Sequence, residues 1–304
     1  MKRPMSPRTP LVFAFAFATA CAAAPAPSPY PLPLAPASAP APAPAVDASP
    51  TPPASAKATA TTPPPTPPPK DPLEVTVVAT DAARAIVDAT DRSDADRALD
   101  PGRHPAEILT LVGAAPGKRI AEIGAWHGYT AELFARAVAP NGTVFAQDPA
   151  AFDKFTREAW AARAKSPALK NVVRVSREYA DPIAANVKNL DAVVCGLFYH
   201  DMVWLKVDRA KMNAAIYRAL APGGFYVVYD HSAREGAGVS EAKTLHRIEE
   251  KVVRAEIEAA GFQLAAVASF LRNPSDARDW SASDEAPKER RGTSDRFVLK
   301  YVKP

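Results

Sequence analysis

The sequence is poor in cysteine and glycine. Two cysteines among 304 residues exclude a disulfide-rich scaffold. Thirteen glycines fall below the roughly 7% of an average protein, and no Gly-x-y repeat occurs, which excludes collagen. An apolar run of ten residues, 11–20, is too short to span a bilayer as a helix.

Proline, in contrast, is abundant and unevenly placed. Of 33 prolines, 22 lie in residues 1–72. Residues 25–72 are nearly all Ala, Pro, Ser and Thr, so they have little apolar surface with which to offset the entropy of ordering. We therefore expect residues 22–72 to form an extended, disordered Pro/Ala-rich linker that acts as a passive tether.

The first 21 residues have the pattern of a signal peptide. Basic residues precede the apolar core 11–20, and small residues then lead to Cys21. Ala18-Thr19-Ala20 before Cys21 resembles the bacterial lipoprotein box, in which the cysteine is lipidated. This resemblance implies export and a lipid anchor at Cys21 in the cell envelope, as the one membrane contact. An ordinary signal peptide and a chance apolar run remain open, and an unused signal would leave the protein in the cytoplasm.

The net charge of +4 belongs to the N-terminal segment. Residues 1–70 hold five basic residues and one acid, which leaves 32 of each sign in the remainder. A neutral domain lacks the basic surface that follows nucleic acid phosphates. We therefore expect no nucleic acid partner, and the sequence indicates no protein partner.

From residue 73 onward, strand-like runs alternate with helical ones. This alternation predicts an α/β domain over residues 73–304, with a Rossmann-like, mostly parallel sheet and helices on both faces. Ligands of such sheets bind at the carboxyl ends of the strands. We expect strands at 118–123, 143–147, 172–176, 190–195, 225–229, 262–270 and 297–302, and helices at 129–138, 149–165, 209–220 and 240–260.

A glycine turn, Glu122-Ile-Gly-Ala-Trp-His-Gly-Tyr-Thr130, follows the first of these strands. Glycine lets the backbone approach a ligand, and the next helix points its N–H groups at it. Asp148, at the end of the following strand, is placed to accept hydrogen bonds from ribose hydroxyls. Trp126 in mid-turn disfavours a dinucleotide pyrophosphate but suits a nucleoside. The predicted cofactor residues are Glu122, Gly124, Ala125, Trp126, Gly128 and Asp148.

These residues resemble the class I S-adenosylmethionine (SAM)-dependent methyltransferases. The turn is similar to their first motif as small-molecule O-methyltransferases have it, and Leu220-Ala-Pro-Gly-Gly224 to their Leu-x-Pro-Gly-Gly turn. The resemblance implies a seven-stranded sheet, SAM as cofactor and a small-molecule methyl acceptor. Residues 73–304 also resemble a bacterial family of predicted methyltransferases through 96–97, 103–107, 199–201, 230–232, 246–247, 261–262, 271–276, 292–297 and 303–304.

Histidines and acids gather after the strands. His200 follows the fourth strand and His231 the fifth, with Asp201 and Asp230 beside them. A histidine next to a carboxylate can take the proton that a methyl acceptor loses. We expect His200 to be the base, Asp201 or Asp230 to orient it, and His231 to shape the acceptor pocket. Polar packing or a divalent ion held by these four residues remains an alternative, but no tight ligand spacing supports a metal and none is assigned.

Other residues have plainer expected roles. His127 either caps the glycine turn or contacts the cofactor, and His246 makes a structural contact with a neighbouring acid. Cys195 belongs to an apolar strand and is expected in the core. Arg103-His-Pro precedes the first strand as a candidate lid over the cofactor. The long polar insertion 272–295 is either an acceptor-side gate or a solvated loop.

The sequence thus predicts a membrane-tethered methyltransferase. A rival hypothesis is a non-catalytic envelope binding protein on a methyltransferase-like scaffold, because SAM is not expected outside the cytoplasm and Trp126 fills a turn that is usually kept small. A cytoplasmic enzyme is the third possibility.

Lipidation at Cys21 is directly testable. Cells that express the full chain should incorporate labelled fatty acid into it, and Cys21→Ser should abolish the label because no other residue matches the lipoprotein box. Labelling is read on gels of the purified protein. An unlabelled wild type would contradict the lipoprotein hypothesis.

Overall fold

The computed structural model describes residues 71–283 and 285–304. The predicted signal peptide, Cys21 and nearly all of the predicted linker lie outside these residues. Within the described residues, no helix is both long enough and apolar enough to cross a membrane.

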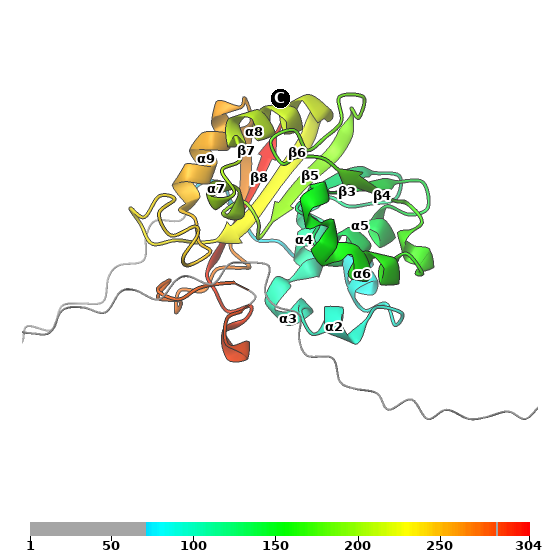
Figure 1. Ribbon diagram of the computed structural model, residues 1–304, viewed down its shortest axis with the longest axis horizontal. Coiled ribbons are helices and arrows are strands. Elements are labelled where there is room, and N and C mark those ends of the chain that lie inside the picture. Colours follow the sequence, from blue (N-terminus) through cyan, green and yellow to red (C-terminus); the bar gives the residue numbers. More distant parts are fainter. Residues whose placement is uncertain (1–70, 284) are drawn as a thin grey trace, which may run out of the picture. The chain divides into compact units, whose positions relative to one another are not determined.

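In the described part of the chain, eight strands form one sheet in the order β1-β7-β8-β6-β5-β2-β3-β4 (Figure 1). Only β8 runs antiparallel to its neighbours β6 and β7. This confirms the predicted class I methyltransferase fold, and β1 is an eighth, two-residue strand at the edge beside β7. The strands are β1 (Glu74–Val75), β2 (Arg119–Ile123), β3 (Thr143–Asp148), β4 (Val172–Ser176), β5 (Leu190–Gly196), β6 (Leu220–His231), β7 (Gln263–Ala268) and β8 (Arg296–Val302).

Helices cover both faces of the sheet. Residues of α1, α4 and α5 form one apolar core and residues of α7, α8 and α9 the other, and Figure 1 shows α8 and α9 together on one side. Cys195 of β5 lies in the second core, fully buried as predicted. The helices are α1 (Asp81–Val87), α2 (Asp94–Arg97), α3 (Asp100–Arg103), α4 (Pro105–Val112), α5 (Tyr129–Val138), α6 (Asp153–Arg163), α7 (Asp201–Trp204), α8 (Arg209–Ala219) and α9 (Glu250–Ala259).

The prediction of a helix over 240–260 is wrong for residues 240–249, because α9 begins only at Glu250. Contacts distant in sequence hold the preceding segment in another conformation. Ile248 forms a β-bridge with Ser232, and the Glu249 carboxylate accepts backbone N–H groups from an earlier glycine turn. The helix predicted over 149–165 is also shorter, since a 3₁₀ turn over 150–152 precedes α6.

A buried ion pair anchors the long segment between β7 and β8. Arg247 is fully buried, and its Nη1 donates to Asp276 Oδ2 at 2.8 Å. Asp276 also accepts from Trp280 Nε1 at 2.7 Å and from the backbone N–H of Asp295 at 2.7 Å. The Asp276 carboxylate therefore joins three parts of the chain: the segment before α9, the segment between β7 and β8, and the residue that directly precedes β8. A gating role for the segment between β7 and β8 stays a prediction.

Removing Asp276 should destabilise the protein strongly. In Asp276→Ala the buried Arg247 loses its counter-charge, and we expect the free energy of unfolding to fall by about 3–5 kcal/mol. Urea unfolding at neutral pH measures this loss. Asp81→Asn, whose carboxylate faces Arg84 in full solvent, is the matched control and should leave stability unchanged. Equal stability of Asp276→Ala and wild type would contradict the anchor.

Candidate active site

The glycine turn after β2 is closed by aromatic side chains. Gly124 and Gly128 have φ of 73° and 79°, a left-handed conformation that favours glycine. A Cβ atom at Gly124 would lie 2.4 Å from the Phe198 ring, and one at Gly128 would lie 2.8 Å from the Trp160 ring. Both glycines are therefore required by backbone conformation and by close packing.

Trp126, between these glycines, also adopts a left-handed φ of 48°. Such backbone is uncommon for a bulky residue and is held by its surroundings. Its N–H donates to Asp148 Oδ1 at 3.3 Å, and its carbonyl accepts from Trp160 Nε1 at 2.6 Å. The turn is thus fastened to the end of β3, where the ribose-binding acid was predicted.

Two buried acids flank the turn, Glu122 in β2 and Asp148 at the end of β3. They are 6% and 1% exposed. Each has one oxygen, Glu122 Oε2 and Asp148 Oδ2, without a hydrogen-bond partner among the described residues. Burial raises the pKa of Glu122 to about 8, with a further contribution from Asp148, and burial likewise raises the pKa of Asp148 to about 7. The pair is suited to a ligand that brings hydrogen-bond donors or positive charge.

Aromatic rings cover Asp148. The Phe152 ring lies 5.8 Å from that of Trp126 and 5.7 Å from that of Tyr179, and the Tyr179 hydroxyl is 3.4 Å from Asp148 Oδ1. The ring of His127 lies at the surface, 4.9 Å from Trp126, so it contacts this cluster rather than the acids. Flat apolar rings next to a ribose-type acid provide stacking surfaces for a purine base.

The predicted lid residue Arg103 ends α3. Its guanidinium lies over the ring of Tyr129, the first residue of α5, at 4.6 Å from the ring centre. This places Arg103 beside the helix that follows the glycine turn. Its role as a lid stays a prediction.

The four predicted catalytic residues come together at the ends of β5 and β6. Asp230 is fully buried, and its Oδ1 lies 2.8 Å from His200 Nδ1, while its Oδ2 accepts the His200 backbone N–H at 2.7 Å. On the other side of the ring, His200 Nε2 lies 3.2 Å from Asp201 Oδ1. Both acids therefore contact His200, one at each ring nitrogen.

The two carboxylates determine the charge of His200. Burial alone lowers the pKa of this imidazole, but the charges of Asp230 and Asp201 overcome burial and raise its pKa to about 10. The same interaction keeps the pKa of Asp201 below its usual range. At neutral pH His200 is therefore an imidazolium, which cannot accept a proton. This argues against the role of base that the sequence predicted for it.

The pKa of His231 is shifted in the opposite direction to that of His200. Burial and the charge of His200 lower its pKa well below the usual value, so it is neutral at pH 7. Its Nδ1 lies 2.7 Å from Ser294 Oγ, and its backbone N–H donates to Asp230 Oδ1 at 2.8 Å. His231 is the uncharged imidazole of the pair.

His246 joins this cluster. Its Nδ1 lies 3.3 Å from His200 Nε2 and 3.5 Å from Asp201 Oδ1. The predicted contact with an acid is thus present, but the sequence placed His246 on a helix and did not bring it to His200. The residue has a left-handed φ of 53° in the segment before α9. Because 46 residues separate the two histidines, no short motif could have revealed the cluster.

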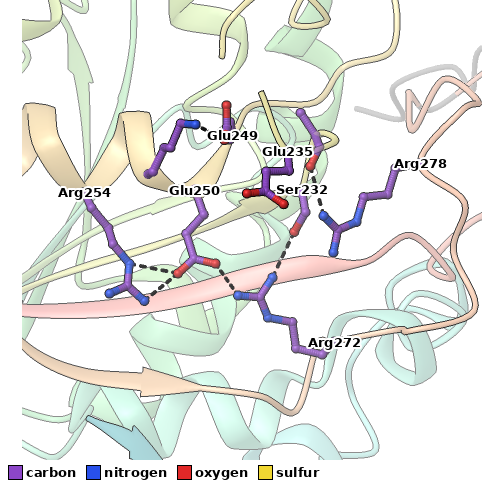
Figure 2. Close-up of a pocket in the computed structure, with 9 residues that line it drawn as sticks. Ser232, Glu235, Glu249, Glu250, Arg254, Arg272 and Arg278 are labelled. Carbon is purple, nitrogen blue, oxygen red and sulfur yellow. Dashed lines mark hydrogen bonds and ion pairs between the residues drawn. The ribbon is translucent and has the colours of Figure 1, made fainter. Parts of the chain in front are cut away.

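A charged cleft of about 380 Å³ adjoins the end of β6, and sequence reasoning missed it. Ser232, which directly follows His231, lies in its wall. Figure 2 shows Arg254 and Arg272 both facing Glu250, and Arg272 Nη1 donates to Ser232 Oγ at 3.1 Å. Segment 246–250 connects the histidine cluster to this cleft. The lining residues are Ser232, Ala233, Glu235, Glu249, Glu250, Lys251, Arg254, Arg272 and Arg278.

Part of this chain matches a model of a known protein family. The family model described as "Methyltransferase domain" matches residues 121–231, which span the glycine turn, Asp148 and the histidine cluster up to His231. No curated protein matches the chain.

Several solved structures are similar to this chain. A SAM-dependent methyltransferase from Aquifex aeolicus is 16% identical over 74% of this chain and all of its own, with a TM-score of 0.49. An arsenic(III) S-adenosylmethionine methyltransferase from Chlamydomonas reinhardtii is 16% identical over 72% of each chain, with a TM-score of 0.47. Fibrillarin from Aeropyrum pernix, in complex with S-adenosyl-L-methionine, is 13% identical over 62% of this chain and 68% of its own, with a TM-score of 0.42.

The raised pKa of Glu122 predicts a pH-dependent stability. Its folded-state pKa of about 8 exceeds the usual 4.5, so the folded protein retains a proton that the unfolded chain releases. Stability must then fall as pH rises from about 4.5 to about 8. Urea unfolding at pH 5 and pH 8 should show the wild type losing about 3 to 4 kcal/mol more than Glu122→Gln, at about 1.36 kcal/mol per pH unit. Parallel losses in the two proteins would contradict the assignment.

Proposed function

We propose that this protein is a SAM-dependent methyltransferase that acts on a small-molecule acceptor. The observation that carries the proposal is the pair of buried acids beside the glycine turn, Glu122 and Asp148, each with one oxygen that accepts no hydrogen bond from the described residues. Unpaired buried carboxylate oxygens are costly, and a ligand with hydroxyl and ammonium donors would satisfy them. SAM has both kinds of donor and, when bound, supplies an electrophilic methyl group.

Different residues of the chain would bind different parts of the cofactor. Asp148 Oδ2, which lies 3.8 Å from Arg174 Nη2 and accepts no hydrogen bond within the described part of the chain, would accept hydrogen bonds from ribose hydroxyls. Glu122 would face the positively charged end of the cofactor. The rings of Trp126 and Phe152 would stack on the adenine. A cationic ligand would favour the ionised form of both acids, so binding should release protons at neutral pH.

The histidine cluster would serve the acceptor. Both ring nitrogens of His200 contact a carboxylate, so the ring would act through its positive charge, which can stabilise negative charge as it develops on the acceptor. His231 is neutral and can take the proton that the acceptor loses. The base role therefore moves from His200 to its neighbour on β6, because the two imidazoles differ in charge.

The rival hypothesis is a binding protein on the same scaffold that transfers no methyl group. The buried oxygens of both acids that accept no hydrogen bond from residues the structure describes favour a site that still takes a ligand, which the enzyme and the binding protein would share. Turnover alone separates them. Export and lipid anchoring through Cys21 stay proposals from the sequence.

Calorimetry on the full chain tests cofactor binding. SAM and S-adenosylhomocysteine should bind, and Asp148→Asn should weaken SAM by about 10- to 100-fold, the usual value of a hydrogen bond to a charged group. Asp153→Asn is the matched control, since Asp153 contacts the same arginine, Arg174, as Asp148 but is half exposed. Its affinity should equal that of wild type.

A methyl-transfer assay on the same proteins distinguishes the enzyme from the non-catalytic scaffold. Label from methyl-labelled SAM should pass to compounds in a mixture of small alcohols, phenols and amines. His231→Gln should bind SAM normally but transfer the label about 100-fold more slowly. A folded protein that gives no binding heat would overturn the proposal, and binding without transfer would support the non-catalytic scaffold.

A further inference from the structure

We propose that His200, Asp201 and His246 form a binding site for a divalent metal ion of the zinc type. Their three ligand atoms are His200 Nε2, Asp201 Oδ1 and His246 Nδ1, and all lie within 4.8 Å of one another. The pairwise distances are 3.2, 3.3 and 3.5 Å. The ion-binding claim is independent of methyl transfer, and only its use by an acceptor rests on the proposed function.

These distances match a coordination polyhedron. Zinc binds nitrogen and oxygen ligands at about 2.0–2.2 Å in a tetrahedron, which places neighbouring ligand atoms about 3.3–3.6 Å apart. The three atoms therefore already occupy one face of such a tetrahedron. Two histidines and one carboxylate are also a donor set that zinc accepts. Three protein ligands leave the fourth position open for another molecule.

The surrounding contacts orient the ligands as metal sites require. A metal-binding histidine usually donates its other ring N–H to a carboxylate, which fixes the tautomer. His200 Nδ1 lies 2.8 Å from Asp230 Oδ1, so Nε2 is turned toward the other two ligands. Asp201 Oδ1 accepts from Trp204 Nε1 at 2.7 Å. His200 and Asp201 are thus each held by a residue outside the triad.

The charge of the cluster also calls for a cation. Asp201 is 5% exposed and Asp230 is fully buried, and two carboxylates removed from water need nearby positive charge. A dication bound by Asp201 and the two histidines would supply that charge.

The open position suits an acceptor with an oxygen or sulfur lone pair. His246 is the least buried of the three ligands, and its side chain is 15% exposed. The segment that begins at His246 continues to Glu249 and Glu250 in the wall of the charged cleft. A hydroxyl or thiol compound that enters from this side would complete the coordination sphere.

Metal binding by the full chain tests the proposal without SAM. Chelator-treated protein is titrated with Zn²⁺, and with Co²⁺, whose visible absorption reports tetrahedral coordination. We expect one ion per chain. His246→Gln should weaken binding more than 100-fold, and Asp230→Asn, which removes a supporting carboxylate, by about 10- to 100-fold. His104→Asn is the matched control, a half-exposed histidine with Glu107 at 3.9 Å and a left-handed φ that asparagine tolerates.

The outcomes are decisive in either direction. One ion that is lost in His246→Gln and retained in His104→Asn supports the site. No ion in wild type, or equal affinity in wild type and His246→Gln, overturns it and leaves a proton-bridged cluster. Because His246 is partly exposed, its variant should remain folded, which circular dichroism checks. SAM calorimetry on the same samples separates failure of this site from failure of the cofactor site.

Discussion

The Asp230 carboxylate is the group on which the candidate site depends. It accepts the backbone N–H groups of His200 and His231 and contacts the His200 ring, all within 2.8 Å. His200 follows β5 and His231 is the last residue of the neighbouring parallel strand β6, so one buried charge fixes the conformation at the ends of both strands. A carboxylate removed from water needs such partners. The backbone geometry and the charge of the site therefore have the same cause.

The elements that sequence reasoning predicted well are those whose signals are local. The glycine turn and the apolar periodicity after it predicted a helix over 129–138, and α5 has these bounds. Strand β4 likewise has its predicted bounds. The segment 240–249 failed because distant partners outweigh its helical pattern: Ser232 pairs with Ile248, and Asp276 binds Arg247. Neither partner can be identified from nearby residues.

For the candidate site too, local signals predicted some features, and contacts distant in sequence determined others. The principle that ligands bind where parallel strands end predicts that Asp148, His200 and Asp230 lie at one edge of the sheet, because that principle depends only on strand direction. The contact of His246 with His200 and Asp201 depends on the conformation of the irregular segment before α9. The protonation of His200 depends on two carboxylates that contact it from opposite sides. Sequence patterns carry neither kind of information, so the proposed base, His231, differs from the base that the sequence predicts, His200.

The burial of Cys195 makes the protein's thiol chemistry simple to interpret. Its sulfur lies in the core of the sheet, and burial raises the pKa of the thiol well above its usual value. The reactive thiolate is therefore suppressed and shielded from reagents. Since the chain has only two cysteines, any thiol that a maleimide reagent modifies in the native protein belongs to Cys21. The second thiol would become reactive only when the sheet opens, so one reagent reports both modification of the N-terminal segment and unfolding of the domain.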